Sequence, residues 1–238
     1  AAAAYSLRKL RTAYTGSAIR VRRASDNTES DIGFNVFGEL DTVSLASFCS
    51  GTNGFVAKWY DQASTNDATQ STTANQPKIY DSVTGVVTEN GKPIMNDPEQ
   101  GEIFSASFTG NSSATICSVL TGSNGYQDIF LKSGSNYYFR TQSDVTTVGS
   151  YVNGIGTVTT YANGSLQGNL SRKEANDLVE NSQTNLFATC DLSGFTNLIM
   201  GTSSRGGMNM QEVIIWNSDQ SSNRTNIEDN INTFYSIY

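Results

Sequence analysis

Carboxylates, hydroxyls and aromatic rings are the side chains that could carry chemistry in this 238-residue chain, because the sequence contains no histidine. Histidine is the usual general base, the commonest metal ligand and the switch that titrates near neutral pH. Its absence excludes Ser-His-Asp and Cys-His arrangements for nucleophilic catalysis. The glycine pairs at 122–125 and 154–156 lack the strand-to-helix context of a phosphate-binding loop, so they predict none.

Two clusters of acidic and amide side chains could supply the oxygen ligands that calcium prefers. They are Asp26, Glu29 and Asp31, and Asp61, Asn66 and Asp67. Neither cluster has the spacing of a specific calcium loop, and turn capping is the commoner use of Asp and Asn. We therefore expect no cofactor, with calcium as the alternative.

Aromatic side chains could stack on the apolar faces of sugar rings. The candidates are Trp59, Tyr60, Tyr137, Tyr138, Phe139, Tyr151, Tyr161 and Trp216. Neighbours in a strand point to opposite faces, so about half of any such set lies in the core. We expect Trp59 and Trp216 in the core, and we expect Tyr138 and Tyr151 to be the exposed carbohydrate-binding candidates.

The three cysteines, Cys49, Cys117 and Cys190, are far apart and odd in number. They show neither the paired spacing of a metal site nor a disulfide framework. The pattern predicts three small hydrophobic side chains in or near the core, which fits synthesis under reducing conditions.

The net charge of −7 is spread unevenly along the chain. Six of the 15 basic residues lie in the first 23 positions, with no acid among them: Arg8, Lys9, Arg11, Arg20, Arg22 and Arg23. Without a recognition helix or aromatic platform, this stretch predicts no nucleic-acid binding. We expect the cations to face the acidic remainder of the fold or a neighbouring subunit. No apolar run approaches the roughly 18–20 residues that cross a bilayer, so no membrane partner is expected.

Short strands punctuated by Gly and Asn fill the chain from about residue 103. The expected strands are 103–108, 114–120, 126–131, 136–142, 157–162, 165–170, 185–191, 196–201 and 210–217. Spacing near ten residues is typical of a sandwich or barrel. Asn163-Gly164 suits a tight hairpin turn. Upstream, residues 5–11 predict a helical turn, 18–23 and 54–60 predict strands, and 42–48 predict a short helix after Asp41.

The C-terminal segment 221–238 has a different pattern. Ile227, Ile231 and Phe234 recur at helical spacing, so one apolar stripe can pack on the sandwich. The sequence shows no linker or composition break, so we expect one domain over residues 1–238. No signal peptide opens the sequence, and Ala1–Ala4 resembles the interior of a longer chain, of which this domain would be the C-terminal part.

The run from Ala4 to Asn27 (AYSLRKLRTAYTGSAIRVRRASDN) resembles the start of the catalytic domain of the α-L-arabinofuranosidase B family, glycoside hydrolase family 54. The blocks at 59–62 (WYDQ), 67–70 (DATQ) and 90–93 (NGKP), and the ending from Gln211 (QEVIIWN), are also similar to that family. The resemblance implies an all-β fold. We expect a concanavalin A-like jelly-roll sandwich of two antiparallel sheets with short N-terminal and C-terminal helices.

Family members hydrolyse sugars with two carboxylates. The resemblance implies a nucleophilic Glu on a mid-chain strand and an acid/base Asp in a glycine-rich loop before the last strands. The matching loop here is 201–207 (GTSSRGG), in which Ser203 or Ser204 falls at the acid position. Between Lys132 and Arg172 the only acid is Asp144, in an unlike setting. The family's adjacent cysteine pair is missing too, so we expect no catalytic residues and no enzyme.

The same opening resembles modules at the ends of bacteriophage structural proteins. We therefore expect a non-catalytic structural and recognition module of a virion protein, in a head decoration, fibre or tail. Such a module would be made in the host cytoplasm and lie on the virion surface. We expect it to be a homo-oligomer that contacts other virion proteins through its basic N-terminal stretch and host-surface glycans through its outer face. The alternatives are a lectin-like carbohydrate-binding module of a non-viral surface protein, and a working α-L-arabinofuranosidase.

Overall fold

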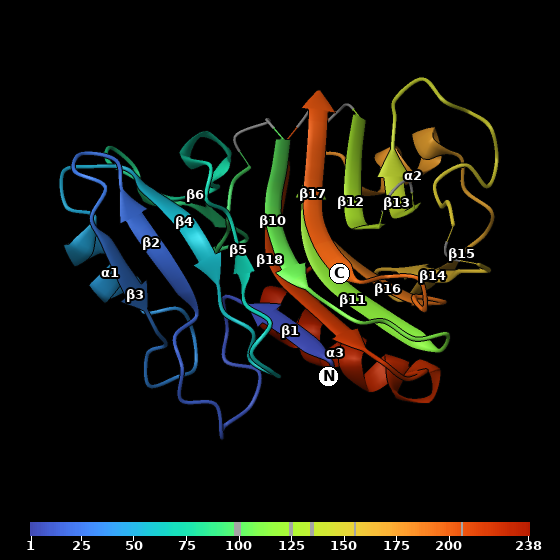
Figure 1. The fold of residues 1–238 in the computed structure, drawn as a ribbon, viewed down its shortest axis with the longest axis horizontal. Helices are drawn as coiled ribbons and strands as arrows, with labels where there is room; N and C mark the ends of the chain where they lie inside the picture. Colours follow the sequence, from blue (N-terminus) through green and yellow to red (C-terminus); the bar gives the residue numbers. More distant parts are fainter. Residues whose placement is uncertain (98–100, 124–125, 134–135, 155, 206) are drawn as a thin grey trace.

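The computed structural model describes residues 1–97, 101–123, 126–133, 136–154, 156–205 and 207–238. Two antiparallel sheets form a sandwich (Figure 1). The smaller sheet has the order β1 (Ala3–Ser6), β18 (Met208–Trp216), β11 (Ala114–Gly122), β16 (Thr184–Cys190), β14 (Thr159–Ala162), β15 (Ser165–Gln167). The larger has the order β13 (Asn136–Thr141), β12 (Tyr126–Ser133), β17 (Asn197–Arg205), β10 (Gly101–Ser107), β5 (Ala68–Thr69), β4 (Gly54–Trp59), β2 (Ile19–Arg23), β3 (Glu29–Ile32). Beside β4 lie β6 (Lys78–Asp81) and β7 (Gly85–Val86).

The predicted two-sheet sandwich is confirmed. Its hairpins use the turn residues that the sequence offers: Asn163 and Gly164 join β14 to β15 with φ of +49° and +77°. Asn90 and Gly91 join β8 (Thr88–Glu89) to β9 (Lys92–Pro93) with φ of +47° and +72°. Positive φ at both central residues matches the twist of a tight hairpin.

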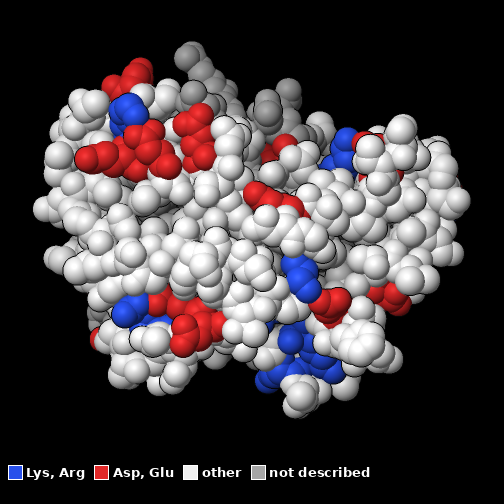
Figure 2. Space-filling view, turned by 180° about the vertical axis from the view of Figure 1, so that it is seen from behind, with Lys and Arg blue, Asp and Glu red and all other residues white. Residues whose placement is uncertain are grey.

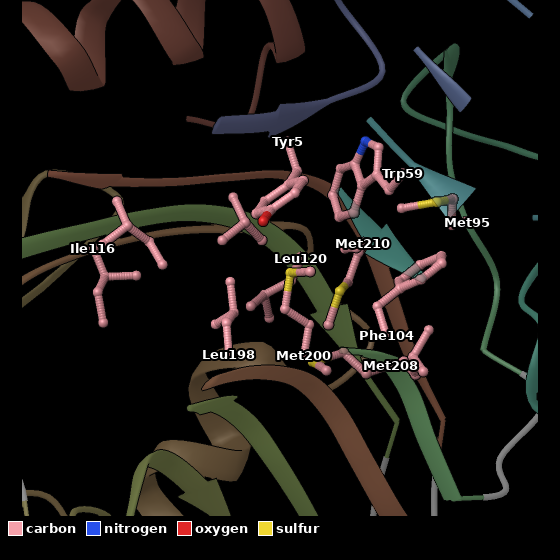
Figure 3. Packing of buried hydrophobic residues seen from close by; sticks show 14 of the residues in the cluster. Tyr5, Trp59, Met95, Phe104, Ile116, Leu120, Leu198, Met200, Met208 and Met210 are labelled. Carbon is pink, nitrogen blue, oxygen red and sulfur yellow. The ribbon is translucent and has the colours of Figure 1, made fainter. Parts of the chain in front are cut away.

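The core lies between the sheets and is rich in aromatic and sulfur-containing side chains (Figure 3). Trp59 is fully buried, with its ring centroid 5.7 Å from that of Tyr5 and 6.0 Å from that of Phe104. Met95, Met200, Met208 and Met210 surround these rings. Burying each such side chain contributes about 1.5–3 kcal/mol. The expectation that Trp59 belongs to the core is confirmed.

The N-terminal helix is not formed. Residues 3–6 instead form edge strand β1, which pairs antiparallel with β18 from Ala3↔Ile215 to Ser6↔Glu212. All four side chains are buried, because β1 is covered on both faces. Residues 5–11 suggested a helical turn, but strand pairing satisfies the backbone groups of residues 3–6 and buries Tyr5 beside Trp59.

Three α-helices lie outside the sheets in the described part of the chain. Helix α1 (Thr42–Phe48) starts as expected at Asp41, whose carboxylate accepts from the Ser44 N–H at 3.0 Å. Helix α2 (Arg172–Val179) was not expected; Ser171 and Glu174 form a capping box at its start. Helix α3 (Arg224–Tyr235) packs Ile231 and Tyr235 on the outer face of the smaller sheet, as the tail's apolar stripe predicts. None of the described helices is long and apolar enough to cross a membrane.

Candidate functional site

The segment 201–207 is not the loop that the sequence suggested. Gly201–Arg205 completes β17, which lies between β10 and β12 in the larger sheet (Figure 1). Ser203 of β17 is in register with Gly101 of β10 and with Gln127 of β12. The position where the resemblance places the acid/base is therefore flanked by two strands.

Acidic residues occupy register positions on both of these flanking strands. Glu102 of β10 pairs with Thr202 of β17, and Thr202 pairs on its other side with Asp128 of β12. On the next strand, β13, Arg140 is the register partner of Asp128. Neighbouring strands lie about 4.8 Å apart, which puts the Glu102 and Asp128 backbones about 9.5 Å apart. We call Glu102, Thr202 and Asp128 the carboxylate row.

Gly201 sets the geometry of β17 immediately before the row. Its φ is +67°, and a β-carbon there would lie 2.3 Å from Cδ1 of Ile103. Only glycine fits both the left-handed backbone and this close approach. Across the ladder Ile103 and Phe104 are both buried, at 2% and 0% exposure, although they are neighbours. Both faces of β10 are therefore covered beside Gly201.

A third carboxylate lies close to the start of β10 in the chain. Asp97 is 3% exposed and accepts a hydrogen bond from the Met208 N–H at 3.1 Å. Next to it, the Gly207 N–H donates to Oγ of Ser123 at 2.7 Å. These bonds tie the start of β18 to the segments that lead into β10 and follow β11.

A polar groove lies along the same sheet. Two adjoining cavities of about 320 Å³ each share Thr69, Gln70 and Ser71, and one of them reaches Ser105 of β10. The Gln70 amide donates to the Ile103 carbonyl at 3.1 Å, which joins the groove to the strand that carries Glu102. Hydroxyl and amide groups of this kind can hydrogen-bond to sugar hydroxyls.

Ion pairs hold the far side of the groove. Arg20 donates from Nε to Oδ1 of Asp31 at 2.7 Å, and this hydrogen bond lowers the pKa of the Asp31 carboxyl. Tyr60 also donates to Oδ1 of Asp31, at 2.8 Å. Burial is the main cause that raises the pKa of the Tyr60 phenol to about 12, and the Asp31 carboxylate adds to it. Asp31 is thus engaged by two donors of the protein.

The other calcium candidates have protein partners as well. Asp26 pairs with Arg23, and Asp67 accepts from the Asp61 N–H at 3.1 Å. Asp61 accepts from the N–H groups of Ala4 and Ala63, both at 2.8 Å. Among the described residues no group of three or more acidic or cysteine side chains is arranged to hold a metal ion. Calcium stays a prediction that the structure does not test.

The block 59–62 is structural. Gln62 accepts from the Leu10 N–H at 2.8 Å and donates to the carbonyls of Ser6 and Arg8 at 3.2 and 2.8 Å. Together with Asp61, it fastens the segment after β4 to β1. One of the most family-like stretches of the sequence thus secures the N-terminal strand.

The expectation that Tyr138 and Tyr151 are exposed is wrong. They are 1% and 4% exposed, and each hydroxyl lies 3.3 Å from Oγ1 of Thr160. Phe139 packs edge-on between their rings, at 5.7 and 5.8 Å. Neither ring offers a free face to a sugar. Asp144, the one acid between Lys132 and Arg172, is exposed at the surface.

Half of the cations of the N-terminal stretch form ion pairs within the domain. Arg8, Arg20 and Arg23 form ion pairs with Glu212, Asp31 and Asp26. Three of the six thus face acidic groups of the same fold, as the sequence suggested. The three cysteines are free and buried, also as expected.

Comparison with known proteins finds one matching family and several solved structures with a similar fold. The family model described as "Alpha-L-arabinofuranosidase B, catalytic" matches residues 1–166. No curated protein matches the chain. A Glu-to-Gln variant of a family 54 α-L-arabinofuranosidase soaked with 4-nitrophenyl α-L-arabinofuranoside superposes with a TM-score of 0.63 at 14% identity. The match covers 97% of this chain and 62% of that one.

Two further solved structures are similar. One is a family 54 α-L-arabinofuranosidase soaked with a cyclic sulfate inhibitor (TM-score 0.62, 13% identity). The other is an arabinofuranosidase complexed with arabinofuranosyl-α-1,2-xylobiose (TM-score 0.61, 13% identity). Each match covers 97% of this chain and 62% of the other, so this chain spans less than two thirds of these proteins. At such identity they support the fold. The expectation that the chain is not an enzyme is contradicted by the match to a model of catalytic domains.

Proposed function

This chain belongs to the family of α-L-arabinofuranosidase B catalytic domains, and we propose that it hydrolyses terminal α-L-arabinofuranosyl linkages. The observation that carries the proposal is the carboxylate row. The resemblance alone leaves the acid position at Ser203 or Ser204 without a carboxyl group, whereas Glu102 and Asp128 occupy the strands on either side.

The spacing of the row suits glycoside hydrolysis. Catalytic carboxyl groups lie about 5–5.5 Å apart in retaining enzymes and about 6.5–9.5 Å apart in inverting ones. A backbone separation of about 9.5 Å is compatible with either range. Directly paired positions of neighbouring strands share a face, which is the arrangement that the proposal requires.

We assign the two roles from the register. Asp128 is in register with Arg140 and is assigned as the nucleophile, because a positive charge on the neighbouring strand favours a carboxylate. Glu102 is assigned as the acid/base. It would protonate the leaving glycosidic oxygen while Asp128 bonds to the anomeric carbon. It would then take a proton from the water that releases arabinose and restores the Asp128 carboxylate. The groove beside Ser105 and Gln70 would hold the rest of the substrate.

Hydrolysis of 4-nitrophenyl α-L-arabinofuranoside tests this proposal. The wild-type domain should release 4-nitrophenol, and Asp128→Asn should lower kcat by about 10²–10⁴-fold or more. Glu102→Gln should slow an alkyl arabinofuranoside more than the 4-nitrophenyl substrate, because 4-nitrophenolate leaves without a proton. Asp144→Asn, which removes an exposed carboxylate elsewhere, is the matched control and should keep full activity. The proposal fails if the wild type releases nothing, or if both row variants stay active.

We also propose, from the resemblance of the opening residues alone, that the domain is carried on a bacteriophage particle. There it would trim arabinofuranosyl groups from host-surface glycans. Labelling purified particles with an antibody to the domain tests this placement separately from the hydrolysis.

A further inference from the structure

A second cleft lies on the opposite side of the sandwich from the carboxylate row. It has a volume of about 400 Å³ and opens between the N-terminal segment, the outer face of β18 and helix α3. This volume is within the range of small-ligand sites, about 300–1,000 Å³. Nothing in the proposed hydrolysis uses this cleft.

The floor of the cleft is apolar and includes one aromatic ring. Ile214 and Trp216 come from alternate positions of β18, and Ile227 and Ile231 come from successive turns of α3. The expectation that Trp216 belongs to the core is wrong, because this side chain is only partly buried. An apolar floor with an aromatic side chain suits the face of a pyranose ring.

Polar groups at the rim are available for hydroxyls. Asn226 and Asn230 lie one helical turn apart on α3, are both exposed, and both line the cleft. The hydrogen bonds found among the described residues engage neither side-chain amide. Two amides on one helix face can donate to and accept from neighbouring hydroxyl groups of one ring.

The cleft has an excess positive charge. Arg8 and Glu212 lie at its base and neutralise each other, with Nε and Oε2 2.7 Å apart. Arg11 at the rim is exposed and takes part in no ion pair within the described part of the chain. Figure 2 shows a group of Lys and Arg atoms at the lower edge of that view, with Asp and Glu atoms beside it. The cleft therefore favours an anion over a cation.

We propose that this cleft binds a uronic acid residue of a glycan, with the ring on the Trp216 floor, the hydroxyls at Asn226 and Asn230, and the carboxylate at Arg11. The sugar ring accounts for the apolar floor and the paired amides, and the carboxylate accounts for the single uncompensated guanidinium. The site would hold an acidic polysaccharide on one face while the opposite sheet acts on arabinofuranosyl groups. Its existence does not depend on the hydrolysis.

Tryptophan fluorescence gives a local readout, because the chain has two tryptophans and Trp59 is fully buried. Titration with methyl glucuronide should shift the emission of Trp216, and Trp216→Phe should abolish the shift. Arg11→Gln should weaken binding about ten-fold or more, the loss expected for one charge-assisted hydrogen bond. Lys173→Gln removes the same charge from the exposed Lys173–Asp177 pair on α2 and should leave the affinity unchanged.

Two comparison ligands make the test decisive. Methyl glucoside lacks the carboxylate, so it should bind to the wild type more weakly than methyl glucuronide does. Its affinity for Arg11→Gln should equal its affinity for the wild type. Benzoate, which lacks the hydroxyls, should bind more weakly than methyl glucuronide, and Asn230→Ala should not affect it. The proposal is overturned if methyl glucuronide causes no shift, if Arg11→Gln binds like the wild type, or if benzoate binds as tightly as the sugar acid. Hydrolysis measured on the same variants should be unchanged, so failure of either proposal is visible separately.

Discussion

Replacing Arg8 by Met should strongly destabilise the fold, because it leaves a buried carboxylate without its countercharge. Glu212 is fully buried and accepts from Nε and Nη2 of Arg8 at 2.7 and 3.0 Å. Its remaining donors are the neutral hydroxyls of Ser6 at 2.8 Å and Tyr235 at 3.2 Å. Removing one partner of a buried pair costs about 3–5 kcal/mol. Met keeps the apolar stem, so the lost charge dominates the effect.

Urea unfolding at pH 7, followed by circular dichroism, measures this cost. For a domain of this size, a loss of 3–5 kcal/mol corresponds to a decrease in Tm of about 6–20 °C. The double variant Arg8→Met with Glu212→Met should recover most of the loss, because replacing both ions by apolar groups is often neutral or stabilising. The coupling free energy from the complete cycle should therefore exceed about 2 kcal/mol. A single-variant loss below about 1 kcal/mol, or a double variant that loses the sum of both singles, would refute this view of the pair.

Three further predictions concern other parts of the fold. Gly201→Ala should lower the free energy of unfolding by about 1–3 kcal/mol, because φ is +67° and the new β-carbon would meet Ile103; an unchanged urea midpoint would contradict this. Burial raises the pKa of Glu89, whose one hydrogen-bond partner among the described residues is the Thr121 hydroxyl at 2.7 Å. Its contribution to stability is therefore present below about pH 4.5 and is lost as the pH rises through the folded-state pKa. Glu89→Gln should therefore stabilise the protein at pH 8 relative to the wild type and have little effect at pH 4; a pH-independent difference in unfolding free energy would exclude this. Burial raises the pKa of Cys49 to about 11 and of Cys117 and Cys190 to about 12, so a thiol reagent at pH 8 should modify none of them before unfolding and all three after it. Rapid modification of the native protein would show that at least one thiol is accessible.

Local patterns in the sequence were sufficient for most strands and for two helices. Apolar alternation and glycine punctuation located β10, β11, β16 and β18 to within two residues at each end. Asp41 and the stripe of Ile227, Ile231 and Phe234 located α1 and α3. The N-terminal segment was misassigned because pairing with β18, more than 200 positions away, decides between strand and helix there.

The tyrosines show where alternation fails. Tyr137, Tyr138 and Phe139 are consecutive in β13, yet all are buried, at 6%, 1% and 0% exposure. The strand is covered on both faces. Helix α2 packs on β13, with Arg172 donating to the Tyr137 hydroxyl at 2.7 Å, while Tyr138 and Phe139 join the core. Phe139 has φ of +59°, which interrupts the regular pleat. A rule of period two assigns one face to solvent only when that face is uncovered.

The carboxylate row could not have been found from motifs. Glu102 lies 100 positions from Thr202, and Asp128 lies 74 positions from it, so only the sheet order brings them together. A motif search looks for an acid at the aligned position itself, and Ser203 and Ser204 fail that test. An antiparallel sheet can supply the same chemistry from a neighbouring strand, which sequence spacing does not show.

The central claim is that Glu102 and Asp128 form the pair that cleaves arabinofuranosyl linkages. The most direct measurement is a trapping experiment with an arabinofuranoside that carries a good leaving group and a slowly hydrolysed glycosyl intermediate, followed by peptide mass spectrometry. Our account predicts one arabinofuranosyl adduct on the peptide that contains Asp128, absent in Asp128→Asn and accumulating further in Glu102→Gln. An adduct on another residue, or none in an actively hydrolysing protein, would contradict it.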